Sequence, residues 1–320
     1  MQSAGSEFRT LAELIPQLVW VSTPEGKTEY ANQRWREYLG EGTSAAEGWR
    51  ATVHPDDRDE SLTRWSSALQ SGKQYEAEFR MLRTDGTYRW FLARATAVRD
   101  ADGKILRWFG TCTDIHDQKQ AQVASSFLAE ASDVLASSLD YEATLASITR
   151  LAVPRFADWA AVDLITSENT IHRVEVAHVD PQKVHLAWDL ARKYPPLLTD
   201  EVGLAQVLRT GRAEFTPLIP PLDRLITDPE LLRILQGLAL RSSIVVPMTA
   251  RGRTLGAITF VTAESRRIYT AADLRTAEDL ARRAGVAIDN ARLYKESLNV
   301  SRMKDEFLST LSHELRTPMT

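Results

Sequence analysis

The chain has 320 residues, of which 43% are hydrophobic and 26% charged, and its formal net charge is -4. This length exceeds the usual size of one domain core, so we expect two folded domains of ordinary globular composition. The charge balance gives no reason to expect nucleic acid as a partner. Cys112 is the single cysteine, which excludes an internal disulfide and a multi-thiolate zinc site and fits a reducing compartment.

No stretch approaches the roughly 20 consecutive apolar residues that cross a bilayer. Residues 1–8 lack the charged start and apolar run of a signal peptide. We therefore expect a cytoplasmic protein without a membrane partner, and a membrane segment elsewhere in a longer parent protein stays open.

The first domain reads as a compact antiparallel unit. Asn32 is expected to cap one helix, and His54 to open a second one that ends near Ser71. Asp85-Gly86 and Asp102-Gly103 are tight hairpin signals, because Gly and Asp accept a positive φ. Apolar and charged residues alternate at 75–81, the period of a half-buried strand. The expected strands are 18–21, 28–31, 75–81, 88–98 and 105–113.

From residue 114 to residue 138 the apolar positions recur at helical spacing without Gly or Pro, which indicates a helical connector. Asp140 begins the next helix, and a second mixed domain follows. Its expected strands are 157–165, 171–178, 213–216, 243–249 and 254–262, with a helix at 184–193 and an extended loop at 217–221.

Thr270 is expected to cap a long helix that continues to the end of the sequence. Ala284, Ile288, Ala291 and Leu298 mostly follow a three-four repeat, the pattern of a coiled-coil seam. Met303 and the apolar residues after it do not keep that register, so the supercoil would change locally. An exposed apolar seam predicts a parallel homodimer.

A histidine stands near the end of this helix. At about 100° per residue, Phe307, Leu308, Leu311 and Leu315 share one face, and His313 lies roughly opposite. Glu314 is adjacent to His313, and Thr317 lies one turn further on the same side. A neutral imidazole attacks phosphoryl groups near neutral pH, and a carboxylate beside it can accept its proton. For a lone helical histidine, a plain surface residue would be the simpler interpretation.

Residues 307–318, however, closely resemble the H-box of sensor histidine kinases. The resemblance implies that His313 accepts phosphate from ATP and passes it to an aspartate of a response regulator. It also implies that Glu314 is the acid/base partner of His313, that Thr317 supports dephosphorylation of the regulator, and that the helix dimerises in a four-helix bundle.

The 320 residues include neither the second helix of that bundle nor the ATP-binding domain. No Walker-type glycine loop takes its place. ATP and Mg are therefore expected as cofactors of the full-length kinase and not of this chain, which should be inactive alone. The segment at 294–320 would be the truncated start of the dimerisation and phosphotransfer helix.

Residues 8–118 resemble a PAS domain, an α+β fold with a five-stranded antiparallel sheet. The resemblance rests on residues 30–32, 54–58, 85–86, 89–90 and 110–115, with Trp20, Val21 and Trp35. It implies a sensor of a small molecule or a protein contact, whose signal leaves by the helix after Asp114, the connector at 119–140.

The sequence does not reveal the PAS ligand. The Asn-Cys-Arg-Phe segment of flavin photosensors is absent, and Cys112 is expected to be a small buried residue. His54 is expected to cap the following helix, and haem ligation is the minor alternative. The remaining candidates for a ligand cage are expected to be core aromatics: Trp20, Trp35, Trp90 and Trp108.

Residues 124–293 resemble a GAF domain, also an antiparallel sheet with helices, whose folded part we place at 141–293. The resemblance rests on residues 243–248, 256–260, 269–273 and 288–293. The bilin-attaching cysteine of phytochromes and the cyclic-nucleotide signature are both absent. His172, His178 and His185 lack the close spacing of metal ligands, so we expect surface histidines and no metal site.

The leading hypothesis is the sensory region of a two-component histidine kinase, with a homodimeric partner, a response regulator receiver domain and an unidentified small-molecule signal. A non-catalytic PAS/GAF ligand-binding or scaffold protein is the alternative, and a GAF photoreceptor is a third. The intact motif at His313 favours the first.

Overall fold

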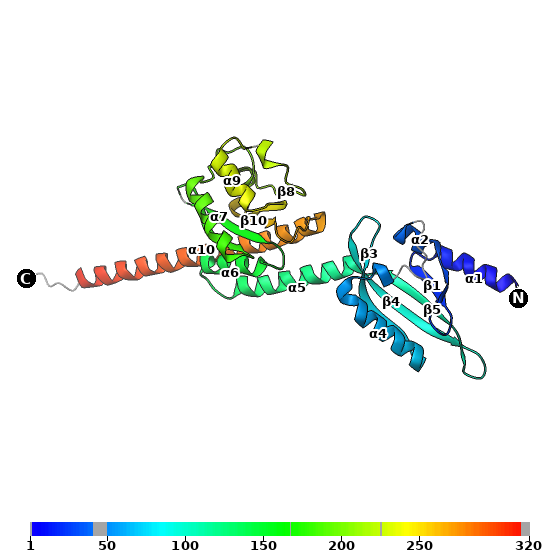
Figure 1. Cartoon of the computed structure of the whole chain (residues 1–320). Helices are drawn as coiled ribbons and strands as arrows, with labels where there is room; N and C mark the ends of the chain where they lie inside the picture. The colour runs from blue at the N-terminus through cyan, green and yellow to red at the C-terminus, as the bar shows by residue number, and fades with distance from the viewer. Residues whose placement is uncertain (1, 41–49, 167, 225, 315–320) are drawn as a thin grey trace, which may run out of the picture. The chain divides into compact units, whose positions relative to one another are not determined.

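The computed structural model describes residues 2–40, 50–166, 168–224 and 226–314. The chain folds into two compact units, and the boundary between them in the sequence lies between Val123 and Ala124 (Figure 1). Each unit is built on one five-stranded antiparallel sheet, which confirms the expected α+β class.

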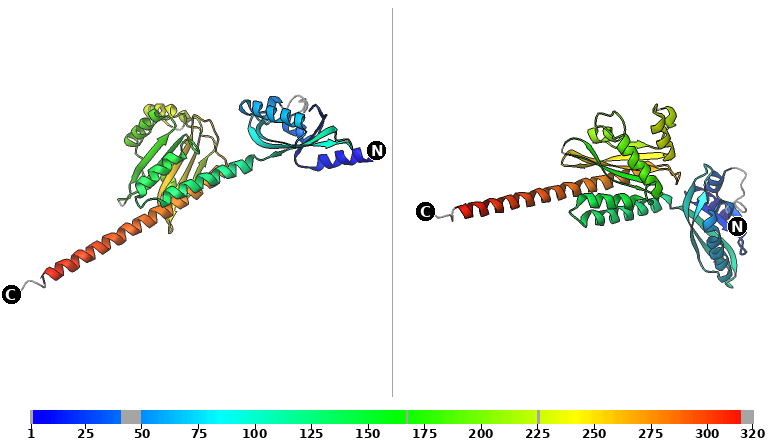
Figure 2. Two further views of the ribbon diagram at one scale, coloured as in Figure 1. Left: turned by 90° about the horizontal axis from the view of Figure 1, so that it is seen from below. Right: turned by 60° about the vertical axis from the view of Figure 1, so that its left-hand side comes forward.

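In the first unit the strands lie in the order β2-β1-β5-β4-β3. Helices α2 and α4 lie on one face of this sheet (Figure 2). Trp35 of α2 and Trp65 of α4 pack there against the inward side chains of the strands. The elements are α1 (Gln2–Leu14), β1 (Leu18–Ser22), β2 (Thr28–Ala31), α2 (Gln33–Leu39), α4 (Pro55–Ser71), β3 (Tyr75–Leu82), β4 (Tyr88–Arg99) and β5 (Ile105–Asp114).

Turn residues at the expected positions close the hairpins of this sheet. Gly86 and Gly103 both adopt a φ of +83°, a conformation that favours glycine, and they connect β3 to β4 and β4 to β5. The expected strands and both expected helices of this unit are therefore confirmed, with ends shifted by a residue or two.

The expected capping role of Asn32 is wrong. Asn32 occupies the N-cap position of α2, but its side chain makes no capping hydrogen bond. Instead, its buried Oδ1 accepts from the Val19 amide, and its Nδ2 donates to the carbonyls of Ala12 and Gln17. Asn32 thus joins β1 to the end of α1, because a buried amide gains more from three partners than from one exposed cap.

In the second unit the strands lie in the order β7-β6-β10-β9-β8. Helix α5 (His116–Ala136) begins in the first unit and ends in this one. The further elements are α6 (Tyr141–Ala152), β6 (Trp159–Ile165), β7 (Ile171–His178), α7 (Pro181–Lys193), α8 (Leu204–Thr210), β8 (Glu214–Thr216), η1 (Leu222–Arg224), α9 (Pro229–Gly237), β9 (Ser242–Ala250), β10 (Arg253–Thr262) and α10 (Ala271–Glu314).

Both faces of the second sheet are covered. Ala160 and Val162 of β6 face the larger core, which α5, α6 and α10 complete. Trp159 and Ala161, on the opposite side of the same strand, pack with Ala187 of α7 and with Leu238 just after α9. The period-two alternation of strand side chains accounts for this division.

Helix α10 lies very close to β9. A Cβ atom placed on Gly285 would lie 2.5 Å from the carbonyl oxygen of Thr249, so only glycine allows this approach. Ala284 and Ile288 are buried in the core of the same unit. Ala291 is buried as well, so three of the four expected seam residues are already covered within one protomer, whereas Leu298 is 43% exposed.

The helices α1, α8 and α9 were not expected from the sequence. The connector is also more than a spacer, because Phe127, Ala131 and Leu135 of α5 are core residues of the second unit. Among the described residues, no helix is long and apolar enough to cross a membrane.

Candidate functional site

A cavity lies in the first unit between the sheet and helices α2 and α4. Counted with its mouth to solvent, the hollow encloses about 490 Å³. The lining residues that the structure describes are all uncharged: Trp20, Gly26, Thr28, Trp35, Trp65, Tyr75, Phe79, Ala93 and Cys112.

Aromatic rings make up most of the cavity wall. The Trp65 ring meets those of Trp20, Tyr75 and Trp108 edge to face, with centroids 5.3, 5.0 and 5.4 Å apart. Such edge-to-face pairs fix one another's orientation, so the cavity has a defined shape. Trp35 and Trp108 are buried as expected for core residues, and Trp20 and Trp35 line the cavity in addition.

Hydrogen bonding of the lining residues is uneven. The Tyr75 hydroxyl lies 3.4 Å from the Ser61 Oγ, and the Trp20 side chain hydrogen-bonds to the Cys112 thiol. Trp35 Nε1 is buried without a partner. Burial raises the pKa of Cys112 to about 12, so the thiol is neutral, which agrees with the expectation of a small buried residue.

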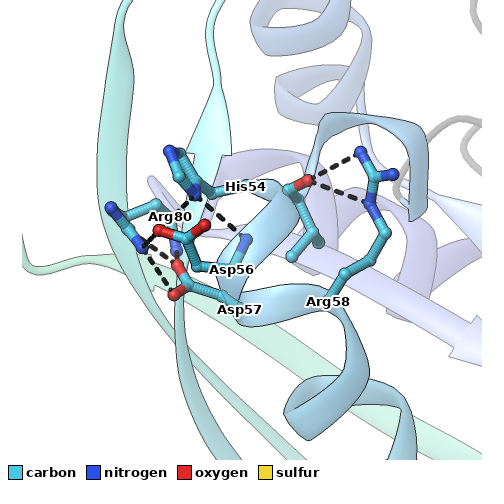
Figure 3. Close-up of polar contacts among 6 residues, drawn as sticks. His54, Asp56, Asp57, Arg58 and Arg80 are labelled. Carbon is cyan, nitrogen blue, oxygen red and sulfur yellow. Dashed lines mark hydrogen bonds and ion pairs between the residues drawn. The ribbon is translucent and has the colours of Figure 1, made fainter.

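The start of α4 is held by a polar cluster (Figure 3). His54 Nδ1 accepts from the amide of Asp56, which confirms the expected capping role of His54. Arg58 donates to the Val53 carbonyl from Nε and Nη2 at 3.3 and 3.1 Å. Arg80 of β3 donates to both oxygens of Asp57 at 2.8 Å and to Asp56 at 3.1 Å. This cluster locks the helix to the sheet.

A second polar cluster lies where β5 passes into α5. Arg89 of β4 donates to Asp114 at 2.5 Å and to Asp117 at 3.0 Å. The amide of Ile115 donates to the carbonyl of Trp90 at 2.9 Å. The Trp90 ring is contacted by the cations of Arg80 and Lys119, each 5.4 Å from its centroid.

Trp90 therefore links the two clusters. The sequence suggested a core aromatic, but Trp90 is only partly buried, and two cations lie against its ring. Arg80 of β3 and Lys119 of α5 thus contact the same ring.

The candidate phosphotransfer residues lie at the far end of α10. His313 and Glu314 belong to this helix, and the structure gives no side-chain description for either. Thr317 lies outside the described residues. The helical setting on which the H-box interpretation depends is thus present up to Glu314, and the roles of the three side chains stay predictions.

The second unit holds a buried ion pair and a buried histidine. Arg173 donates to both carboxylate oxygens of Asp163 at 2.8 and 3.1 Å. His178, expected on the surface, is buried, with its side chain 1% exposed; its Nδ1 accepts from the Asp180 amide, and burial lowers its pKa. His172 and His185 are exposed as expected. In the part of the chain that the structure describes, no three His, Cys, Asp or Glu side chains form a potential metal site.

Of the nine described residues that line the cavity, six were not among the ligand candidates of the sequence. Tyr75 and Phe79 alternate in β3, and Ala93 lies opposite Ala77 on the neighbouring strand. The period-two pattern of β3 was visible and placed the first two on the inward face. Trp65, by contrast, lines the cavity because α4 packs on the sheet, and no local sequence pattern predicts that packing.

Comparison with known families agrees with this architecture. The model of the PAS fold family matches residues 28–112, and the model of the GAF domain family matches residues 138–289. The chain combines a PAS domain with a GAF domain. The first unit is therefore called the PAS domain and the second the GAF domain.

Curated relatives match about a third of the chain. Uncharacterized protein y4lL of Sinorhizobium fredii is 37% identical over 122 residues, which cover 38% of this chain and 15% of that protein. Peroxide stress-activated histidine kinase mak1 of Schizosaccharomyces pombe is 37% identical over 117 residues, which cover 36% of this chain and 7% of that protein. The chain thus spans a small part of the length of these relatives.

Among solved structures, the N-terminal domain of a diguanylate cyclase with PAS/PAC sensor from Marinobacter aquaeolei is 24% identical, with a TM-score of 0.30. The match covers 32% of this chain and 98% of that domain. Together, the PAS and GAF domains support a role as a signal-transduction sensor.

Proposed function

We propose that this chain is the sensory region of a two-component histidine kinase and that His313 is the phospho-acceptor of the full-length protein. The observation that carries the proposal is the continuity of α10. This single helix starts in the core of the GAF domain and includes His313, the histidine of the H-box-like segment.

Helix α10 directly connects the core of the GAF domain to His313. Its first half is buried in the GAF core through Leu280, Ala284 and Ile288. Gly285 packs against the backbone of Thr249. From Ile288 to His313 the helix rises by about 37 Å at 1.5 Å per residue. A shift or rotation of α10 in the GAF domain therefore changes the position of His313 without any intervening loop.

The proposed reaction is phosphoryl transfer. A ring nitrogen of His313 attacks the γ-phosphorus of ATP, the bond from that phosphorus to ADP breaks, and Glu314 takes the proton that the ring loses. The phosphoryl group then passes to an aspartate carboxylate of a receiver domain. Thr317 supports the later hydrolysis at the regulator. ATP and Mg bind to a catalytic domain outside these 320 residues.

A homodimer and a cytoplasmic location complete the proposal. Large apolar side chains on α10 remain exposed beyond the GAF core, Val300 and Met303 each at 61%. They favour a second copy of the helix as partner. The single thiol, Cys112, is compatible with a reducing compartment.

The full-length parent tests the proposal with labelled ATP and a receiver domain. We expect acid-labile label on the parent and its transfer to the receiver, whereas the 320-residue chain alone gives no label. A parent that binds no ATP and never labels a receiver would favour a non-catalytic PAS/GAF scaffold. A visible absorption band of the purified chain would instead favour a photoreceptor, which we do not expect.

A further inference from the structure

The wall chemistry of the PAS cavity restricts what can bind there. Among the described residues, none of the nine that line the cavity carries a charge, and the rings of Trp20, Trp35, Trp65, Tyr75 and Phe79 dominate. Transfer of a charged group into such surroundings is costly without a partner of opposite charge. Aromatic walls favour flat apolar molecules through stacked and edge-to-face contacts. The walls therefore select an uncharged ring.

One of the lining residues has an unused hydrogen-bond donor. Trp35 is 5% exposed, and its Nε1 has no hydrogen-bond partner. A buried N–H without an acceptor costs free energy that a ligand oxygen or nitrogen would recover. Water is a poor substitute, because a buried water needs two to four polar partners and these walls are mainly carbon. The unpartnered donor therefore favours a ligand that has one hydrogen-bond acceptor and is otherwise apolar.

The dimensions limit the ligand to about one ring. The hollow encloses about 490 Å³ only when its mouth to solvent is counted, at the lower part of the range for small-molecule sites. Gly26, in the turn between β1 and β2, lines this hollow with a φ of +86°. A Cβ at Gly26 would lie 2.8 Å from Leu69 Cδ1 and 3.0 Å from Trp65 Nε1. The turn therefore packs directly against α4 and leaves no room for a side chain at Gly26, so the hollow does not extend further in this direction.

We propose that the PAS cavity binds a small, uncharged, single-ring aromatic molecule that accepts one hydrogen bond from Trp35 Nε1. This inference rests on the proposed sensory function and names the ligand class of that sensor. Cys112 contributes a neutral apolar surface and no nucleophile.

Pyridine and benzene test the proposal, because they differ in one acceptor nitrogen and have nearly the same shape. Binding to the 320-residue chain is measured by ligand-observed NMR and by quenching of tryptophan fluorescence, at mildly alkaline pH where pyridine is uncharged. We expect pyridine to bind about 2- to 10-fold more tightly than benzene, the effect of one net hydrogen bond. N-methylpyridinium, which is charged and has no acceptor, should not bind.

Two variants locate the site. Trp35→Phe keeps a ring but removes the N–H, so pyridine should lose its advantage over benzene. Ala93→Leu fills the cavity and should abolish binding of both. Trp159→Phe is the matched control, because Trp159 Nε1 is also buried without a partner but belongs to the GAF domain. It should leave binding unchanged.

Three results would overturn the proposal: equal affinity of the wild-type chain for pyridine and benzene, binding that survives in a folded Ala93→Leu chain, or no saturable binding at all. The first and third use the wild-type chain, so they decide the question even if a variant fails to fold. None of them bears on phosphorylation of His313, which separates this inference from the proposed function.

Discussion

The carboxylate of Asp57, in the first turn of α4, accepts three hydrogen bonds from one residue, Arg80 of β3. Arg80 Nε and Nη2 donate from the guanidinium at 2.8 Å, and the Arg80 backbone amide donates at 2.9 Å. Hydrogen bonding by Arg80 lowers the pKa of Asp57, and it raises the pKa of Arg80 in turn. The pair fixes the helix that lines the cavity.

Asp57→Asn should destabilise the PAS domain by about 1.5–3 kcal/mol, the usual range for hydrogen bonds to charged groups. Denaturant unfolding followed by tryptophan fluorescence measures the loss. Glu76→Gln is the control, because the ion pair of Glu76 with Arg94 leaves both side chains 55% exposed; it should cost below about 0.5 kcal/mol. Equal losses in the two variants would contradict a special role for Asp57.

The same pair predicts a pH dependence. Because the folded-state pKa of Asp57 is lowered, its contribution is fully present above the unfolded value of about 3.9 and is lost as the pH falls through the folded value. The difference in unfolding free energy between wild type and Asp57→Asn should therefore shrink towards zero only on the acid side of about pH 4. A difference that stays constant into strong acid would show that the charge of Asp57 is not its source.

Cys112 should be protected from alkylation. Its thiol is buried, and burial raises its pKa to about 12, so very little thiolate exists at mildly alkaline pH. Iodoacetamide should react with it only as fast as the PAS domain opens, and at the rate of a free thiol in denaturant. Mass spectrometry of timed samples gives both rates. Rapid labelling of the native chain would contradict the burial of this side chain.

Gly285→Ala should destabilise the GAF domain although alanine is the better helix former. The new Cβ would lie 2.5–2.9 Å from three backbone atoms of Thr249, and such overpacking costs about 1–3 kcal/mol, more than the gain of up to about 1 kcal/mol in helix propensity. Gly237→Ala is the control, since its nearest contact would be 3.5 Å from a leucine methyl. Thermal unfolding of both variants should show the lower midpoint for Gly285→Ala, and the reverse order would contradict the close packing.

The exposed part of α10 should hold the dimer together. Leu298→Asp places a charge among apolar side chains that the GAF core does not cover and should raise the monomer fraction in light scattering. Leu197→Asp changes an equally apolar, 59% exposed residue away from α10 and should not. Wild-type chain that stays monomeric at high micromolar concentration would contradict the predicted dimer.

The sequence predicted most of the fold because its local signals agree with one another. Gly86 and Gly103 mark the turns, and alternation along β3 gives its inward face. Residues with competing options were less predictable. Asn32 makes three buried hydrogen bonds in place of the expected capping bond. The spacing of Ala284 and Ile288 fits a coiled-coil seam as well as the core in which they lie.

The sequence did not predict the cavity, for a related reason. Trp35 and Trp65 come from separate helices, and only their packing on the sheet leaves a hollow between them. The H-box, by contrast, is a local pattern, so its residues could be named from the sequence, whereas the positions of their side chains could not.

The most direct measurement for the central claim is the site of phosphorylation in the full-length parent. Labelling with ATP, followed by peptide mapping under conditions that preserve phosphohistidine, should place the phosphoryl group on His313. His313→Gln should abolish the label without loss of the fold. His172→Gln, at an exposed histidine of β7, should keep it. A label that persists in the His313→Gln parent would show that another residue is the acceptor and would contradict the proposed function.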